Sequence, residues 1–376
     1  MEPHVALALA GLLIGTLFGA TVQRTHYCLM GALADLSLFG SRRRLRSWLL
    51  AVAVALAGTQ LLALLSPFDP GRSFYLRGDL FWLGAVLGGS MFGFGMVLAG
   101  GCVSRNLVRA GAGSLKAWLV LLLVAISAYA TVAGLAAPLY RLLRRLGSFD
   151  PGYAGLGQLV DGLLGLPAGS FPGGLLGLLL AVALFAWVFA DPGFRRHSPE
   201  LSAGVLLGAL VVAGWWATSL LPGAAAAWGT TSLTYVLPTA QSLLYLLVGG
   251  GGLPGFGVML VIGTLIGAFL AAYRGGQFRI EGFADRADLR RHGLGAVLMG
   301  SGGALAGGCT VGQGLSGLST MSFESALAVA AILFGGLRGL RYLETGRLLA
   351  AGPGREDRGG DRPVAMRSFQ PTGPVS

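Results

Sequence analysis

The segment Leu83-Gly-Ala-Val-Leu87 leads into Ala99-Gly-Gly-Cys102, and the same two motifs return in the same order as Leu294-Gly-Ala-Val-Leu298 and Ala306-Gly-Gly-Cys309. Helices rich in glycine, alanine and leucine look alike by composition alone, which is one explanation of the match. The shared order of two separate motifs favours the other explanation, an internal duplication. Each copy is an apolar run that is interrupted by glycine and ends at a cysteine, which is typical of a helix that breaks inside a membrane.

The composition indicates that the solvent of this chain is lipid. Of its 376 residues, 54% are hydrophobic, 64 more are glycine, and 11% are charged. Soluble domains carry about 25% charged residues, and a soluble monomer could not bury so much apolar surface. The mean hydropathy of +0.71 agrees with this. We therefore expect an integral membrane protein, and a disordered chain, a disulfide scaffold or a nucleic-acid reader is excluded.

Apolar runs separated by charged or proline-rich stretches predict an all-α polytopic membrane protein with about nine transmembrane helices. Segments 80–100 and 293–307 are interrupted by glycine and predict short re-entrant or broken helices. We expect one membrane transport domain, residues 1–345, followed by a disordered cytoplasmic tail, residues 346–376. The expected spans are 5–21, 47–65, 80–100, 116–137, 173–190, 203–221, 253–273, 293–307 and 324–341.

The basic residues indicate the orientation of the chain. The formal charge is +11, and the 27 basic residues fall between the apolar runs. With the N-terminus outside, the nine spans place 22 of them on the cytoplasmic side and five outside, as the positive-inside rule requires. We interpret this charge as a topology signal rather than a surface for nucleic acid. The prediction is a multi-pass protein with its N-terminus outside and its C-terminus in the cytoplasm.

On this topology the two copies face opposite ways. The Cys102 turn lies toward the cytoplasm and the Cys309 turn toward the outside, which is the inverted-repeat arrangement of membrane transporters. We place the repeat halves at about 5–137 and 173–341, and we also pair Ile14-Gly-Thr-Leu-Phe-Gly-Ala20 with Ile262-Gly-Thr-Leu-Ile-Gly-Ala268. Proteins of this kind bind their substrate near the middle of the bilayer, at the ends of discontinuous helices.

The three cysteines, Cys28, Cys102 and Cys309, are the candidate functional side chains. Their number and spacing give neither a disulfide framework nor a metal pattern. A small buried hydrophobe is the common role of a free cysteine. Two cysteines at equivalent repeat positions favour a role with a ligand instead. Paired glycines free backbone N–H groups for an anion, and a thiol adds a soft S–H donor that suits a ligand carrying its own sulfur.

Three segments resemble the YeeE/YedE (sulfur transport) family: Gln23-Arg-Thr-His-Tyr-Cys28, Ala99-Gly-Gly-Cys-Val-Ser-Arg105 and Ala306-Gly-Gly-Cys-Thr-Val-Gly-Gln-Gly-Leu-Ser-Gly-Leu-Ser-Thr320. The resemblance implies an hourglass-shaped fold of inverted repeats in the bacterial inner membrane. It implies uptake of thiosulfate, with the cysteines passing the anion along a central path through S–H···S hydrogen bonds. A cytosolic TusA-like sulfur-carrier protein is implied as a partner, although some relatives are associated with selenium metabolism.

We therefore expect a transporter of thiosulfate or a related sulfur anion, with no cofactor, no metal and no catalytic residue. The alternatives are a transporter of another sulfur or selenium compound and a membrane sulfurtransferase that forms a cysteine persulfide. A persulfide mechanism needs a base or cation beside the thiol, and His26 and Arg105 are the candidates. The expected substrate-binding residues are Cys28, Cys102, Cys309, Gly101, Gly308, Thr310, Gln313, Arg24 and Arg105.

Overall fold

The computed structural model describes residues 3–66, 68–76, 78–166, 171–196, 198–220, 230–249 and 254–345. The predicted tail, residues 346–376, lies outside these ranges. Helices make up most of the described chain, and its two strands, β1 (Leu80–Phe81) and β2 (Ser148–Phe149), form one short antiparallel pair. The predicted all-α polytopic fold is confirmed.

The helices follow one another along the chain as a series of long and short elements. They are α1 (Pro3–Thr25), α2 (Leu29–Phe39), α3 (Arg43–Leu65), η1 (Pro70–Arg72), η2 (Phe74–Leu76), α4 (Trp82–Leu98), α5 (Val103–Gly111), α6 (Leu115–Val132), α7 (Ala137–Gly147), α8 (Leu156–Leu163), α9 (Phe171–Phe189), α10 (Pro192–Arg195), α11 (Ser198–Leu220), α12 (Val236–Val248), α13 (Phe256–Arg274), α14 (Arg286–Leu305), the π-helical turn η3 (Gly312–Gly317) and α15 (Phe323–Thr345).

Within the described ranges, eight helical segments are long and apolar enough to cross a membrane. They overlap eight of the nine predicted spans. The ninth, 293–307, falls in α14, which starts with several charged residues and packs between α4 and α6. The breaks predicted inside 80–100 and 293–307 come later than expected. Both α4 and α14 are continuous, and the chain leaves the helix at Gly100 and Gly307, where φ is 69° and 67°.

Six short helices in the described chain, α2, α5, α7, α8, α10 and α12, are absent from the sequence-based expectation. Two of them begin directly after a cysteine, α2 after Cys28 and α5 after Cys102. The 13 residues of α12 rise about 20 Å, less than the roughly 30 Å of a hydrocarbon core. A window of the length used to find spans cannot detect such half-length helices.

Helices α1 and α13 pack against each other through glycine. A methyl group added at Gly15 or Gly267 would collide with a main-chain carbonyl oxygen of the other helix, from Leu260 or Thr16 respectively. Bare glycine ridges of this kind let helix backbones approach closely in lipid. Residues later in α1 contact residues later in α13, so the two helices run in the same direction. The pairing of segments 14–20 and 262–268 as equivalent parts of an inverted repeat is therefore wrong, since equivalent helices of two inverted copies run in opposite directions.

The remaining contacts follow the pattern expected of two inverted copies. Helices α4 and α14 run antiparallel, with Gly88 against Gly302 and Gly95 against Gly295. Helix α4 packs parallel to α15, and α14 packs parallel to α6. Likewise α1 packs on α13, and α3 packs in the same direction on α11. In each case a helix of one copy packs on a helix of the other copy. The equivalent helices of the two copies are therefore α1 and α11, α3 and α13, α4 and α14, and α6 and α15.

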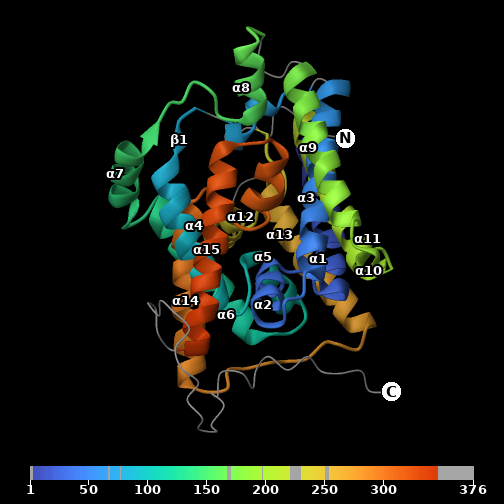
Figure 1. The fold of residues 1–376 in the computed structure, drawn as a ribbon. Coiled ribbons are helices and arrows are strands. Elements are labelled where there is room, and N and C mark those ends of the chain that lie inside the picture. The colour runs from blue at the N-terminus through green and yellow to red at the C-terminus, as the bar shows by residue number, and fades with distance from the viewer. Residues whose placement is uncertain are drawn as a thin grey trace.

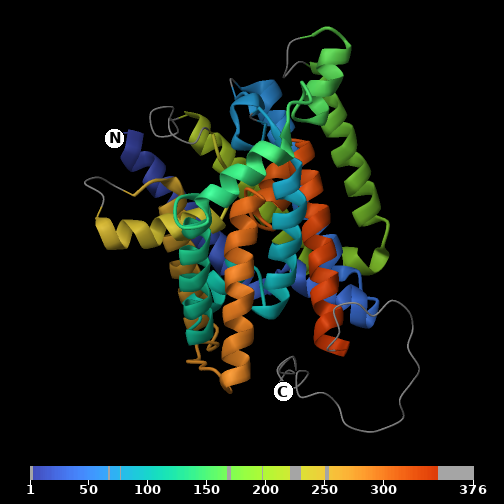
Figure 2. The same ribbon diagram turned by 90° about the vertical axis from the view of Figure 1, so that its left-hand side faces the viewer.

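The two ends of the bundle differ. Figure 1 shows α8 at the end where α1 begins and the start of α14 at the opposite end, with α10 on the right in the lower half of the molecule. Figure 2, turned by 90°, shows the same separation of the two ends. The end where α14 begins also holds the last turn of α1 and the first turn of α3, and most of the described arginines lie there. We call it the arginine-rich end and the other the α8 end.

Replacement of Gly267 by alanine is expected to destabilise the protein. The new methyl group meets the Thr16 carbonyl, and overpacking of this kind costs about 1–3 kcal/mol. Gly293→Ala in α14 is the matched control, because the nearest atom to its added methyl group, Leu123 Cδ1, lies at an ordinary 3.8 Å. The control should be neutral or gain up to about 1 kcal/mol of helix propensity. Thermal unfolding in detergent compares the two, and equal midpoints would contradict this interface.

Candidate functional site

The turn after α4 positions Cys102. Gly100 and Gly101 have φ values of 69° and 157°, a region that favours glycine. Their N–H groups donate to the carbonyl oxygens of Val97 and Met96 and close the end of α4. Cys102 then takes the N-cap position of α5 and is 3% exposed. The expectation that the paired glycines leave their N–H groups free for an anion is wrong here, because these groups cap α4.

The turn after α14 is built in the same way. Gly307 has a φ of 67°, and the N–H of Gly308 donates to the carbonyl oxygen of Gly303. Cys309 is fully buried, and its Sγ accepts a hydrogen bond from the N–H of Gly312 at 3.4 Å. Gly308 thus serves to end α14, and the backbone N–H that does reach a cysteine sulfur comes from the start of η3.

Side chains from both turns meet at Cys102. The hydroxyl of Ser104 lies 3.3 Å from its Sγ. The side chains of Cys28 and Thr310 lie close to the same sulfur and interact with it. Cys28 comes from the start of α2 and Thr310 directly follows Cys309, so the structure joins the N-terminal segment and both glycine turns at one point. All three cysteines are free thiols.

Gln313 and Asn106, each four residues after a cysteine, hold the two turns in place. The Nε2 of Gln313 donates to Ala306 O at 2.6 Å, and its Oε1 accepts the hydroxyl of Ser325. The Nδ2 of Asn106 donates to Gly101 O at 2.8 Å, while its buried Oδ1 has no partner among the described residues. The predicted ligand residue Gln313 thus uses its amide inside the protein. The sequence analysis missed Asn106, whose Oδ1 is an acceptor that no described residue uses.

The two predicted arginines differ in position. Arg105 lies beside the thiols of Cys28 and Cys102, on which its charge acts. Its guanidinium donates to a carbonyl oxygen of α1 at 3.3 Å and lies 3.3 Å from Nδ1 of His26, whose backbone is left-handed with a φ of 52°. Arg24 is exposed at the end of α1, and the structure does not bring it to the cysteines.

An ion cluster at the arginine-rich end supports the Cys102 turn. The Nζ of Lys116 lies 2.7 Å from a carboxylate oxygen of Asp288, in the charged first turn of α14. Partial burial acts to raise the pKa of Asp288, but the hydrogen bond from Lys116 and the charge of His292 outweigh it and lower this pKa to about 2. The ring of His292 lies near Gly100, which connects the cluster to the turn.

A cavity of about 160 Å³ at the α8 end reaches the Cys309 turn. Gly307 forms part of its wall, and Phe256 and Leu7 supply apolar surface. None of the described residues that line it is charged. Its polar side chains are the hydroxyls of Tyr75, Thr218, Thr231, Ser232 and Thr234 and the amide of Gln241. The hydroxyls of Thr218 and Ser232 donate to backbone carbonyl oxygens, so the other hydroxyls and the amide of Gln241 are the neutral donors that this cavity offers to an anion.

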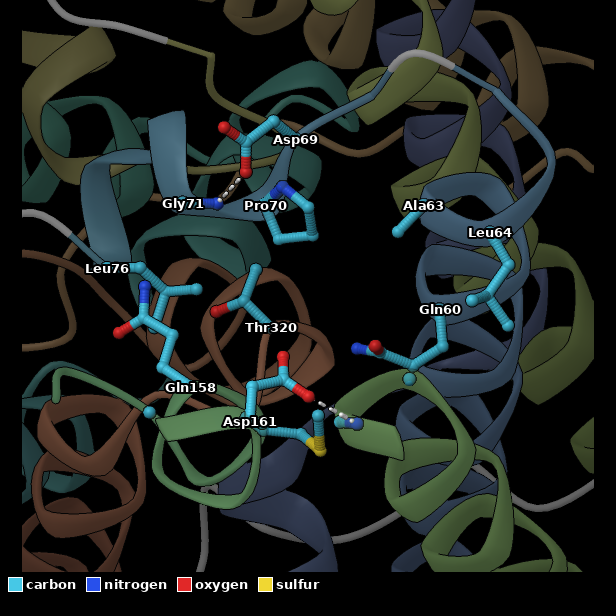
Figure 3. Close-up of a pocket in the computed structure, with 15 residues that line it drawn as sticks. Gln60, Ala63, Leu64, Asp69, Pro70, Gly71, Leu76, Gln158, Asp161 and Thr320 are labelled. Atoms are coloured by element: carbon cyan, nitrogen blue, oxygen red, sulfur yellow. Dashed lines mark hydrogen bonds between the residues drawn. The ribbon is translucent and has the colours of Figure 1, made fainter. Parts of the chain in front are cut away.

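A second cavity, shown in Figure 3, lies beside α3, α8 and α9 and measures about 40 Å³. The carboxylates of Asp69 and Asp161 line it, together with Gln60 and Thr320. Each carboxylate accepts a hydrogen bond from a backbone N–H group of a glycine. Two carboxylates repel an anion, so the hydroxyl-lined cavity is the better entrance for one.

The sequence analysis predicted Thr310 but missed Tyr27, Thr234 and Tyr235, which also lie around the cysteines. Half-buried Tyr27 and buried Tyr235 interact electrostatically with the cysteine thiols, and the buried hydroxyl of Tyr27 has no partner among the described residues. Thr234 lies against Gly312. Tyr235 precedes α12 as Cys28 precedes α2. An alignment of α1–α2 with α11–α12 would have indicated these residues, but the two segments share too few letters to suggest it.

The fold and the site define a polytopic membrane protein with two cysteine-bearing turns at its centre. The sulphur transport family model matches residues 24–337. Thiosulfate transporter TsuA of Escherichia coli (strain K12) is 30% identical over 351 residues, covering 88% of this chain and 93% of the relative. Thiosulfate transporter TsuA of Spirochaeta thermophila is 29% identical over 347 residues, covering 86% and 96%. The chain belongs to the sulphur transport family.

Gln313→Leu is expected to loosen the Cys309 turn. It leaves the Ala306 carbonyl and the Ser325 hydroxyl without their partner, at about 1–3 kcal/mol for each buried group. The matched control is Gln241→Leu, the same change at a side chain for which the described residues provide no hydrogen bond. Thermal unfolding in detergent should separate the variants by several degrees. Equal losses would show that Gln313 does not hold the turn.

Proposed function

We propose that this protein carries thiosulfate, a small sulfur oxyanion, across the membrane into the cytoplasm. The observation that carries the proposal is the meeting of Cys28, Cys102 and Thr310, because it places soft and hard donors from both turns around one point. A thiol suits the sulfane sulfur of thiosulfate, and a hydroxyl suits its oxygens. The names of the two relatives support the same substrate.

In the proposed path the anion enters through the hydroxyl-lined cavity at the α8 end and reaches Cys309 past Gly307. It then passes to the Cys102–Cys28 pair and leaves beside Arg105. Neutral donors favour conduction, because a site must bind strongly enough to admit the ion and weakly enough to release it. Cys102, Cys309, Thr310 and Gln313 are all less than 4% exposed, so this path opens only when the turns move.

We place the arginine-rich end in the cytoplasm of a bacterial cell, at the inner membrane, and the start of α1 outside. The concentration of arginines at one end of the bundle supports this orientation. A TusA-like sulfur carrier would then collect the anion there. Inward movement of two negative charges against 100 mV costs roughly 4.6 kcal/mol, which a concentration gradient, ion coupling or consumption in the cytoplasm must offset.

Uptake of radiolabelled thiosulfate into proteoliposomes tests the proposal. Wild-type protein should accumulate label, unlabelled thiosulfate should compete, and sulfate, which lacks a sulfane sulfur, should compete less. Sulfite and selenite serve as further competitors to define the substrate. Empty liposomes are the control. Equal uptake with and without the protein would remove thiosulfate transport as its function.

Cys102→Ser is expected to lower the uptake rate by about tenfold or more, equivalent to about 1.4 kcal/mol. The hydroxyl is smaller and harder than the thiol, so the contact with the sulfane sulfur is lost although a donor remains. Ser202→Ala, an exposed change far along the chain on α11, is the control and should leave uptake unchanged. Wild-type rates in the Cys102 variant would refute the role of this thiol.

Arg105 beside two thiols is also what a sulfurtransferase would need. In that reaction the Cys102 thiolate attacks the sulfane sulfur, a persulfide forms on the cysteine, and sulfite leaves. Mass spectrometry of wild-type protein during turnover distinguishes the two functions. Transport predicts an unmodified Cys102, and a persulfide on Cys102 with release of sulfite would favour the enzyme.

A further inference from the structure

Helix α7 is amphipathic and is not needed for the path proposed above. Its leucines recur every three or four residues and so share one helix face, while its arginines occupy the opposite face. The leucine face consists of Leu139, Leu142, Leu143 and Leu146, and the arginine face consists of Arg141, Arg144 and Arg145.

The leucine face is not covered by the protein. Leu139, Leu142 and Leu146 are 57%, 51% and 70% exposed, and Leu135, just before the helix, is 98% exposed. A water-facing helix would place polar residues at these positions. Their exposure indicates an apolar surface on the other side of the helix, and in a membrane protein that surface is the edge of the lipid.

The arginine face is equally unpaired. None of the three arginines forms a salt bridge with an acidic side chain in the described part of the chain. Arg144 donates to the hydroxyl of Tyr140 on the same helix, and all three arginines are exposed. The charge of Arg144 acts on the carboxylate of Glu324, whereas Arg141 and Arg145 have no such acidic neighbour among the described residues. The face therefore offers three exposed guanidinium groups, a type of group that recognises phosphate well.

The position of α7 fits the surface of a bilayer. Figure 1 shows α7 projecting sideways from the upper part of the bundle, and Figure 2 shows it running across the long helices rather than along them. It follows directly on the membrane-spanning α6, after a short connection at the α8 end. A helix placed there can sink its leucines among the acyl chains and hold its arginines at the headgroups.

We propose that α7 docks on the membrane surface and binds the phosphate groups of anionic phospholipids through Arg141, Arg144 and Arg145. The leaflet is the outer one in the orientation given above. This explains why three basic residues lie on the side where basic residues are few. They act at the headgroup plane, where anionic lipid attracts each of them, rather than as a topology signal.

The docked helix is connected to the entrance cavity by a short chain of contacts. Strand β2 follows α7 without a break and pairs with β1, where Ser148 faces Phe81. The N–H of Phe81 donates to the carboxylate of Glu324 at 3.2 Å. The same carboxylate lies beside Gly307, which lines the cavity. Anionic lipid on α7 therefore steadies the wall of the entrance as well as the helix itself.

The test compares thermal unfolding of the full chain in nanodiscs of phosphatidylcholine alone and of phosphatidylcholine mixed with phosphatidylglycerol. The anionic lipid should raise the midpoint of the wild type by roughly 3–6 °C, and most of this rise should disappear in the triple variant R141Q/R144Q/R145Q. High salt should also reduce the wild-type rise, because the headgroup contacts are exposed to screening.

The control variant R279Q/R286Q/R290Q removes the same charge from exposed arginines at the arginine-rich end and should keep most of the rise. In phosphatidylcholine alone R141Q/R144Q/R145Q should unfold at the wild-type midpoint, which shows that it folds. The proposal is overturned if phosphatidylglycerol does not raise the midpoint of the wild type. It is also overturned if the midpoints of the wild type and R141Q/R144Q/R145Q rise equally. This readout needs no substrate, so it fails or succeeds independently of thiosulfate transport.

Discussion

The structure depends on one constraint: a helix that ends inside a bilayer must have its last backbone groups satisfied by protein, because lipid offers no hydrogen bonds. Helices α4 and α14 both end in this way. Glycines with positive φ turn the chain back on the last helical turn, and the amides of Asn106 and Gln313 take up the carbonyl oxygens that remain. Because these bonds fix the turns, the cysteines that follow are held at defined positions.

A second requirement, close approach of the long helices, explains where sequence similarity misleads. Segments 14–20 and 262–268 look alike because each supplies glycine and threonine to the same interface between α1 and α13. These two segments are similar because they pack against each other, and not because they occupy equivalent positions in the repeat. The two Gly-Gly-Cys turns, in contrast, do occupy equivalent positions, since each of them ends a helix inside the membrane. We therefore propose repeat halves of α1–α6 and α11–α15, with α7–α10 between them.

The sequence predicted the helical membrane class, eight of the nine spans and the two turns, because composition and glycine spacing carry that information directly. It did not predict α12 or the residues before it, because a half-length helix gives no spanning signal. It assigned Gln313 and Gly308 to the ligand, which stays a prediction, and it did not indicate that hydrogen bonds of both residues hold the turn. Residue type and motif indicate that a side chain can bind an anion, but only the fold decides whether its donors are already used.

The two halves are alike in backbone and different in charge, and the difference bears on where an anion is held. Three residues after Cys102 stands Arg105, and three residues after Cys309 stands Gly312. The position that Cys28 takes before α2 is taken by Tyr235 before α12. An anion that enters at the α8 end thus meets hydroxyls and one thiol first, and then two thiols beside a guanidinium. Since fixed positive charge attracts an anion from a distance, the proposed path would hold the anion most strongly near Arg105, while the net direction of transport would still depend on the driving force.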